Sequence, residues 1–264
     1  EKKNLFLDRY NTLHLAGRDA IKPGKWSTVL GETIIPFQYT DIGEFVDGIA
    51  PASKNEKYGF IDKEGKEIIP VIYSSAWNSQ TDSIVIVSND EKWAFVNNNG
   101  KFLSDFVYDK VFTGYKNMIP SVVNGDKTTY FKNGAVLVLR NKKYEFLNEK
   151  IESAFPENKF DSASVFDTYK NAVVKRSSKY GIINSDGIAK APIEYDFIKY
   201  FDTNHNSSEY YNARKVKVFH IYNKDLKKIG ESHQPIYNDF SVSTPAIIFR
   251  NLQEKYGMVN SNGN

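Results

Sequence analysis

The feature that most constrains this chain is a phrase that returns along its length. Residues 57–73 read KYGFIDKEGKEIIPVIY, and similar phrases are KWAFVNNNGKFLSDFVY at 92–108 and KYGIINSDGIAKAPIEY at 179–195. A further copy begins at residue 255 with KYGMVNSNG. One such unit cannot bury its apolar face alone, so the repetition predicts units that stack on their neighbours.

Weaker copies fill the intervals between the clear ones, at 25–39, 143–160 and 218–237. The sequence therefore predicts six full units and a fragment, starting near residues 25, 57, 92, 143, 179, 218 and 255. Each unit opens with an aromatic residue, 32 to 51 residues after the previous one: Trp26, Tyr58, Trp93, Tyr144, Tyr180, Phe219 and Tyr256.

Each clear unit contains the same local signals. A short apolar stretch rich in β-formers follows the opening aromatic and predicts a strand. An Asx-x-x-Gly pattern then predicts a tight hairpin turn, at 62–65, 97–100, 184–187 and 260–263. A proline is expected to end the second strand, because a proline lacks the amide donor of a sheet ladder, at Pro36, Pro70, Pro156, Pro192 and Pro235.

A second aromatic residue follows this stretch, and a final apolar segment closes the unit and leads into the next one. The second aromatics are Tyr39, Tyr73, Tyr108, Phe160, Tyr195 and Tyr237. This arrangement resembles the WG-repeat family, bacterial repeats named for a Trp-Gly pair, over residues 25–263. No copy here has Trp followed by Gly, since Trp26 and Trp93 precede Ser27 and Ala94. The resemblance implies an all-β interaction scaffold without catalytic residues.

We therefore expect an all-β fold of tandem β-hairpin repeats over 25–264. Stacked units can close into a propeller-like ring or stay open as a twisted array. The unequal spacings favour the open array, although residues 1–24 are expected to act as a closing strand or a linker. Because the first residue is Glu1, we also expect an upstream segment to have been removed.

Composition excludes several classes of function. The 264 residues contain no cysteine, and the four histidines lie too far apart for a local zinc motif, so no metal or cofactor is expected. Lys and Arg number 35 against 32 Asp and Glu, without the basic stripe of a nucleic-acid-binding protein. The longest aliphatic run, 135–139, is too short to cross a bilayer.

Aromatic and acidic residues that recur in phase have a structural and a functional interpretation. The opening aromatics are expected to form the core, although a row of exposed aromatics could bind glycans. Two carboxylates could act in a hydrolase, but an aspartate in every repeat is more typical of a turn cap than of catalysis. These aspartates are Asp41, Asp109, Asp161, Asp196 and Asp239. We expect no enzyme.

Two irregular segments, 124–143 and 202–212, are the favoured binding surfaces, because repeat scaffolds tend to carry function on insertions. The first is expected to form an extra hairpin, and the second is a polar loop with adjacent tyrosines. The predicted partner-binding residues are Trp77, Tyr130, Phe131, Tyr210 and Tyr211.

The sequence thus favours a non-catalytic protein-binding scaffold. We expect a bacterial envelope or secreted factor, such as a toxin inhibitor, with a periplasmic or secreted location favoured over the cytoplasm. The alternatives are a glycan or cell-wall binding module and, third, a carboxylate-dependent hydrolase.

Overall fold

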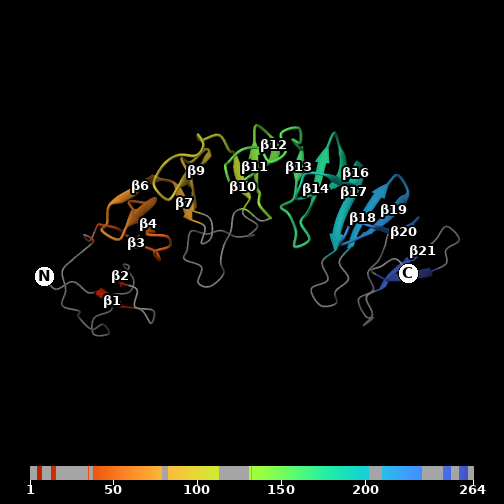
Figure 1. Cartoon of the computed structure of the whole chain (residues 1–264), viewed down its shortest axis with the longest axis horizontal. Coiled ribbons are helices and arrows are strands. Elements are labelled where there is room, and N and C mark those ends of the chain that lie inside the picture. The colour runs from red at the N-terminus through yellow and green to blue at the C-terminus, as the bar shows by residue number, and fades with distance from the viewer. Residues whose placement is uncertain are drawn as a thin grey trace. The chain divides into compact units, whose positions relative to one another are not determined.

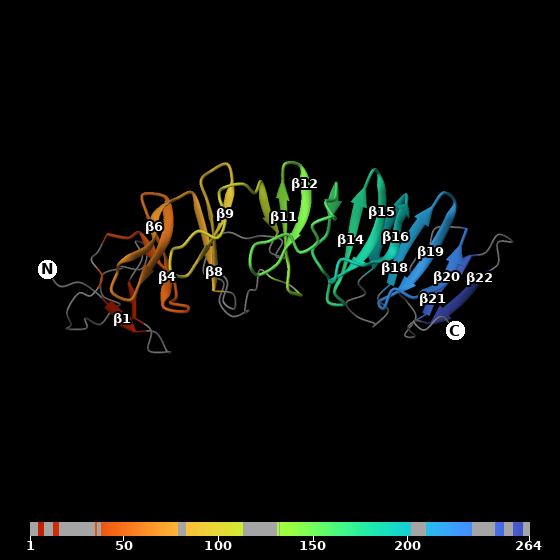
Figure 2. The same cartoon turned by 45° about the horizontal axis from the view of Figure 1, so that its top comes forward.

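The computed structural model describes residues 5–7, 13–15, 35, 38–78, 83–112, 131, 133–201, 210–233, 246–250 and 256–260. The regular elements in these ranges are β-strands, and sequential strands form antiparallel sheets, as Figure 1 and Figure 2 show. The all-β prediction is confirmed. A search of these ranges finds no helix with the length and hydropathy needed to span a membrane.

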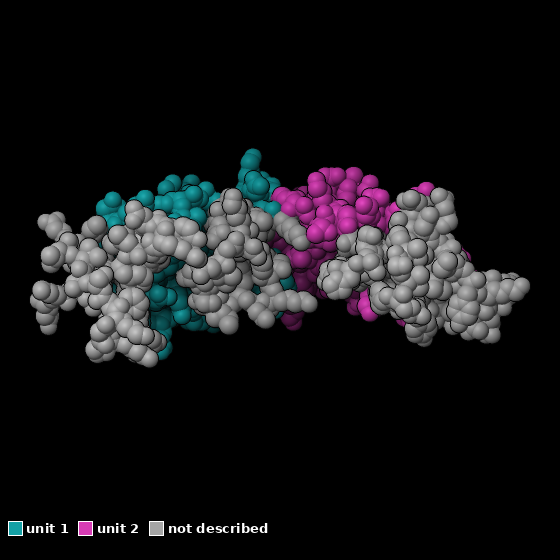
Figure 3. Space-filling view, turned by 90° about the horizontal axis from the view of Figure 1, so that it is seen from below, with its two compact units in different colours: residues 1–131, 138–141, 148–152 teal, residues 132–137, 142–147, 153–264 magenta. Residues whose placement is uncertain are grey.

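The chain divides into two compact units, coloured in Figure 3. Unit 1 comprises residues 1–131, 138–141 and 148–152, and unit 2 comprises 132–137, 142–147 and 153–264. The boundary falls among β10 (Lys110–Phe112), β11 (Val136–Arg140) and β12 (Lys143–Leu147). Each unit is therefore described by itself.

Unit 1 contains one two-stranded, one four-stranded and one three-stranded sheet, each in chain order. The first sheet consists of β1 (Leu5–Leu7) and β2 (Leu13–Leu15), which pair with each other. The second consists of β3 (Asp41–Ile42), β4 (Ile49–Lys54), β5 (Lys57–Asp62) and β6 (Glu67–Tyr73). The third consists of β7 (Ser75–Asn78), β8 (Ile84–Ser88) and β9 (Trp93–Asn97).

Unit 2 contains two four-stranded sheets and a hairpin. One sheet consists of β13 (Ser162–Ala163), β14 (Asn171–Arg176), β15 (Lys179–Asn184) and β16 (Ala189–Tyr195). The next consists of β17 (Phe197–Phe201), β18 (Tyr210–Lys215), β19 (Val218–Asn223) and β20 (Lys228–Ser232). The hairpin pairs β21 (Ala246–Arg250) with β22 (Tyr256–Asn260).

Each four-stranded sheet takes its strands from two successive sequence repeats. In the first such sheet, β4 is the apolar segment that closes one repeat, and it pairs along its whole length with β5, which opens the next. The same pairing joins β14 to β15 and β18 to β19. A sheet therefore begins in one repeat and ends in the following one, which ties neighbouring repeats together through backbone hydrogen bonds.

The Asx-x-x-Gly turns form as predicted. The Asp62 side chain accepts hydrogen bonds from the Glu64 and Lys66 amides, while Gly65 has φ +82° and donates to the Asp62 carbonyl. The turns that begin at Asn97 and Asn184 repeat this geometry. The fourth predicted turn, at 260–263, lies largely outside the described residues.

Further copies of this turn escaped the sequence pattern because they lack glycine: they begin at Asn148, Asp167 and Asn223. Asn148 accepts both amide hydrogen bonds and Asn223 accepts that of Lys227, while Ile151 and Leu226 take the positive-φ position at +62° and +58°. Both apolar side chains are buried. Burial thus offsets the conformational strain of a left-handed residue, about 1–2 kcal/mol.

The prediction that proline ends the second strand is wrong at Pro70 and Pro192, whereas Pro156 lies in a turn and Pro36 and Pro235 lie outside the described residues. Pro70 lies inside β6 and Pro192 lies inside β16. Each strand is the last of its sheet, so the missing amide donor leaves no ladder hydrogen bond unmade. Both strands bulge beside a glycine: a Cβ on Gly59 would lie 2.4 Å from the Pro70 carbonyl oxygen. The glycine after an opening aromatic is therefore required by this close approach.

The second aromatics are buried more deeply than the opening aromatics. Tyr73, Tyr108, Phe160 and Tyr195 are buried and Tyr39 is half-buried, while Tyr237 lies outside the described residues. The described opening aromatics are all only half-buried: Tyr58, Trp93, Tyr144, Tyr180 and Phe219. The prediction that the opening aromatics form the core is thus only partly right. In unit 1, Tyr73 packs with Ala94 and Val96, and full burial of such a side chain contributes roughly 1.5–3 kcal/mol.

Candidate functional site

The residue after the second aromatic connects one sheet to the next within a unit. In unit 2, the Asp161 amide donates to Lys175 O of β14, and the Asp196 amide donates to Arg214 O of β18. The side chains add a second connection, because Asp196 Oδ2 accepts the Val216 amide at 2.7 Å and Asp161 Oδ2 accepts the Ser177 amide at 2.7 Å. The loop that joins the middle strands of each sheet is thereby held by the preceding sheet.

The other oxygen of these aspartates pairs with the lysine before the opening aromatic. Lys179 Nζ lies 2.5 Å from Asp196 Oδ1, and Lys143 pairs with Asp161 in the same way. In unit 1, Lys92 pairs with Asp109.

The lysine, and then the turn amide, hold the pKa of both Asp161 and Asp196 below its usual range. The prediction that the recurring aspartates are structural is confirmed for these two. Asp41 begins β3, and Asp239 lies outside the described residues.

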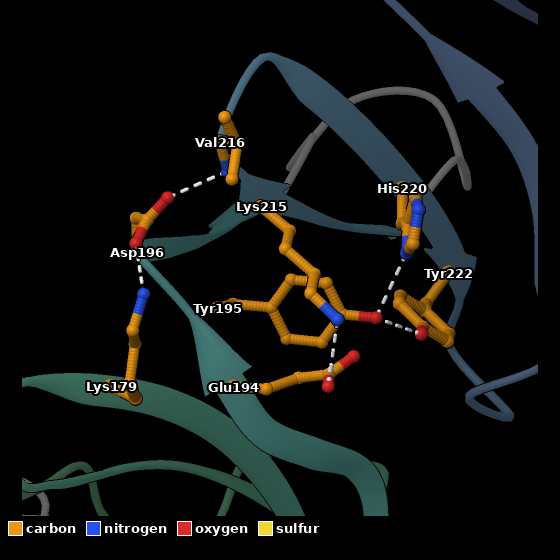
Figure 4. Close-up of polar contacts among 8 residues, drawn as sticks. All are labelled: Lys179, Glu194, Tyr195, Asp196, Lys215, Val216, His220 and Tyr222. Atoms are coloured by element: carbon orange, nitrogen blue, oxygen red, sulfur yellow. Dashed lines mark hydrogen bonds and ion pairs between the residues drawn. The ribbon is translucent and has the colours of Figure 1, made fainter.

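A polar cluster replaces apolar packing where β16 meets β19 (Figure 4). The Tyr195 hydroxyl lies 2.9 Å from His220 Nδ1 and 2.5 Å from the Tyr222 hydroxyl. At the same repeat positions in unit 1, Tyr73 packs on Ala94 and Val96. Burial and the hydrogen bond between Tyr195 and Tyr222 raise the pKa of Tyr195, so the hydroxyl stays neutral. The cluster therefore combines a buried phenol with a half-buried imidazole.

His220 connects this cluster to charged residues near the surface. Its Nε2 lies 3.6 Å from Glu231, which in turn pairs with Lys228 at 2.7 Å. Burial, followed by the charge of Lys228, lowers the pKa of His220. Lys228 also lowers the pKa of Glu231 through a hydrogen bond. The described residues hold no group of three or more metal-ligating side chains, so the cluster is not a metal centre of that kind.

The β17–β20 corner, defined as Phe197, Arg214, Val216 and Lys217, lies beside this cluster. Phe197 opens β17 opposite Arg214 of β18, and Val216 and Lys217 form the turn from β18 to β19. Phe197 is 44% exposed and Val216 is 74% exposed. Figure 4 shows Val216 at the tip of the hairpin, where Asp196 binds its amide. Phe197 at the start of β17 and Val216 in the anchored turn therefore both expose apolar side chains to solvent.

The other repeats show how unusual this corner is. The residue equivalent to Phe197, the first of its strand, is polar in the other four sheets that have three or four strands: Asp41, Ser75, Lys110 and Ser162. The residue equivalent to Val216, the first after the second strand, is also polar in all four: Asn55, Asn89, Asn141 and Ser177. The corner is thus the place where the repeat exchanges two polar surface positions for apolar ones.

Val216 also carries backbone strain. Its φ of +59° is left-handed, where a β-branched residue is an outlier. Asn55, Asn141 and Ser177 take the same conformation with side chains that suit it better. Ile151 takes the same conformation but is buried, whereas Val216 is exposed, so burial does not offset the strain at Val216.

The structure places the predicted partner-binding residues differently from the sequence interpretation. Phe131 is 5% exposed and Tyr211 is 1% exposed, so the expectation that they are exposed anchors is wrong. The Tyr211 hydroxyl instead donates to Asp167, inside the unit 2 core. Adjacent residues in a strand face opposite sides, and β18 turns Tyr211 inward. The Tyr130 and Tyr210 side chains lie outside the described residues.

Trp77 is half-buried rather than fully exposed. Its ring lies 4.7 Å from that of Trp93 with the planes tilted by 43°, and its indole nitrogen is buried without a hydrogen-bond partner. The 124–143 segment includes β11, an ordinary strand of the repeat, whereas most of the remainder and most of 202–212 lie outside the described residues.

Comparison with known proteins identifies the repeat. Residues 30–58, 58–93 and 93–125 match the WG containing repeat family. The boundaries fall at Tyr58 and Trp93, the openings predicted from the sequence. The glycine that gives these WG repeats their name is Gly59 in the second copy, where β6 approaches closely. No curated protein matches this chain.

Several solved structures, including β-propeller proteins, are similar to this chain. Kluyveromyces lactis Hsv2p is 8% identical, with 83% of this chain and 74% of that chain covered and a TM-score of 0.32. A eukaryotic initiation factor is 11% identical, with 90% and 67% covered and a TM-score of 0.40. The extracellular domain of a putative one-component system from B. thetaiotaomicron is 13% identical, with 98% and 40% covered and a TM-score of 0.31. The choice between ring and open array stays a prediction.

Sequence reasoning missed Phe197 and Val216, although a signal was present. Phe197 lies two residues after the second aromatic of its repeat, where the other repeats have polar residues: Asp41, Ser75, Lys110 and Ser162. Val216 lies three residues before an opening aromatic, where four other repeats have Asn55, Asp90, Asn141 and Ser177. The signal is therefore an exchange within a repeat and not an insertion between repeats. Exchanges matter because a regular scaffold provides its own reference for which surface positions should be polar.

Proposed function

We propose that this chain is a non-catalytic protein-binding scaffold built from WG repeats. The expected setting is a bacterial envelope or secreted factor, such as a toxin inhibitor. The observation that carries the proposal is the β17–β20 corner, where Phe197 and Val216 expose apolar surface at positions that are polar in the other four sheets. Exposed apolar residues with a polar rim are typical of protein-binding surfaces.

The corner is ordered before any partner arrives. Asp196 accepts a hydrogen bond from the Val216 amide and forms an ion pair with Lys179. The whole of β17 pairs with β18. Binding a partner therefore costs little conformational entropy at this site, which is the advantage of a preorganised surface. A scaffold role needs no reactive group.

The glycan alternative gains no comparable support. A sugar stacks on an open aromatic face, whereas Trp77 and Trp93 cover part of each other and the opening aromatics are half-buried. The hydrolase alternative requires two carboxylates in one cleft, whereas Asp161 and Asp196 are each paired with a lysine.

The proposal is tested with Phe197→Ser, which restores the residue found at Ser75 and Ser162. We expect the unaltered chain to retain a specific protein from extracts of the source organism, and the variant to bind that purified protein at least tenfold more weakly. Ile188→Ser is the matched control, because Ile188 is 55% exposed in the turn between β15 and β16, away from the corner in sequence. The proposal fails if no protein binds, if a glycan array is bound instead, or if both variants bind like the unaltered chain.

A further inference from the structure

The charges around the β17–β20 corner are unbalanced. Its two carboxylates are already paired, since Asp196 lies 2.5 Å from Lys179 and Glu194 lies 2.8 Å from Lys215. Arg214 and Lys217 are exposed, and neither forms an ion pair with any residue that the structure describes. Arg214 helps to lower the pKa of Asp196, but the four cations Lys179, Lys215, Arg214 and Lys217 still outnumber the two carboxylates by two.

These cations lie on either side of the apolar tip. Arg214 is the cross-strand partner of Phe197, and cross-strand partners share one face of a sheet. Lys217 follows Val216 directly in the turn. The arrangement is an apolar centre with a basic rim, and Figure 4 shows Val216 of this centre with Asp196 bound to its amide.

We infer that the β17–β20 corner binds an acidic protein surface, in which an apolar pocket receives Phe197 and Val216 while carboxylates at its rim face Arg214 and Lys217. The inference rests on the proposed function and names the chemistry of the partner. Charge complementarity of this kind steers association and selects the partner, and apolar burial supplies the affinity. A partner with basic residues at the rim of its pocket would be repelled by Arg214 and Lys217.

A protein fits this surface better than an anionic polymer. Phosphate-rich partners are recognised by clusters of basic residues, whereas this corner has an excess of only two cations around an apolar centre, on a chain of net charge +3. An acidic protein supplies both the pocket and the carboxylates.

The strained valine makes the experiment decisive. Val216→Asn restores the residue found at Asn55 and Asn141, so it should relieve strain and raise the denaturant midpoint while it weakens binding. A loss of binding by a more stable protein cannot be attributed to unfolding.

The partner is identified by placing the photo-cross-linker p-benzoylphenylalanine at position 197 in the full chain, and is then purified. Binding is measured for Arg214→Glu, Lys217→Glu and Val216→Asn at two salt concentrations. Each charge reversal is expected to weaken binding roughly threefold to tenfold and to reduce its salt dependence. Lys142→Glu is the matched control, because Lys142 holds the position of Lys217 in the turn that follows β11.

Each result decides the question. If Phe197→Ser weakens binding but the charge reversals do not, the acidic partner is ruled out while the scaffold proposal stands. Stronger binding after charge reversal would show a basic partner. Retention of the chain on phosphatidylserine vesicles, if Phe197→Ser abolishes it, would show that the corner binds a membrane and overturn the acidic protein. Self-association in sedimentation that Phe197→Ser abolishes would show that it binds a second copy of the chain. If the unaltered chain binds no protein, the proposed function itself fails.

Discussion

Replacing Gly59 by alanine tests why a glycine follows the opening aromatic of a repeat. The added Cβ would lie 2.4 Å from the Pro70 carbonyl oxygen and 2.5 Å from that of Ile69. Ordinary contacts of a Cβ begin near 3.4 Å, so β5 and β6 would have to move apart by about 1 Å. These atoms belong to the backbone and cannot be relieved by a change of rotamer.

The expected cost follows from two opposing effects. Overpacking of this kind destabilises a protein by about 1–3 kcal/mol, and weakened ladder hydrogen bonds add roughly 1 kcal/mol. The loss of glycine flexibility in the unfolded chain returns about 0.4–1 kcal/mol. We expect a net destabilisation of about 2–3 kcal/mol, which shifts a urea midpoint by about 1 M at an m-value near 2 kcal/mol/M.

Tryptophan fluorescence during urea unfolding measures this change selectively. The chain has three tryptophans, Trp26, Trp77 and Trp93, and all of them fall within unit 1, as does Gly59. Ala94→Gly is the matched variant at the same repeat position of the next sheet, where a fully buried methyl group is lost. It should cost about 1–2 kcal/mol through lost burial and added flexibility.

An unchanged or raised midpoint for Gly59→Ala would refute the close-approach argument, because an unhindered glycine in a strand gains stability on replacement by alanine.

Three further predictions concern unit 2, followed by near-ultraviolet circular dichroism during urea unfolding. Tyr195→Phe should destabilise the unit by about 1–3 kcal/mol, because Tyr222 and His220 lose a hydrogen-bond partner; an unaltered midpoint would show that the hydroxyl contributes nothing. Asp196 has a lowered pKa, so its stabilisation is full above its unfolded pKa near 3.9 and is lost as pH falls through the folded value; Asp196→Asn should flatten this acid limb. His220 also has a lowered pKa, so its contribution is full above about pH 6.5 and is lost as pH falls through the folded value; His220→Gln should remove that slope, and an unchanged slope would contradict the assignment.

The sequence by itself determined the all-β class, the repeat and its hairpin turns. These features depend on interactions a few residues apart: Asp62 caps its own turn, and Gly65 supplies the positive φ that the turn requires. Residue type therefore sufficed to predict them. The Asx-x-x-Gly pattern did not predict the turns at Ile151 and Leu226, because burial there offsets the strain of a positive φ at a residue other than glycine.

Only the tertiary structure decided which aromatics fill the core and where the candidate site lies. Tyr58 and Tyr73 are both apolar enough for burial, but the pairing of β5 with β6 and the packing of the next sheet bury Tyr73 more deeply. In the same way, Tyr211 is buried because its side chain lies on the inner face of β18. Val216 lies in a turn whose amide is bound by Asp196, the residue between β16 and β17, and it is exposed. Burial depends on contacts between residues far apart in the chain, and a sequence pattern records those contacts only indirectly.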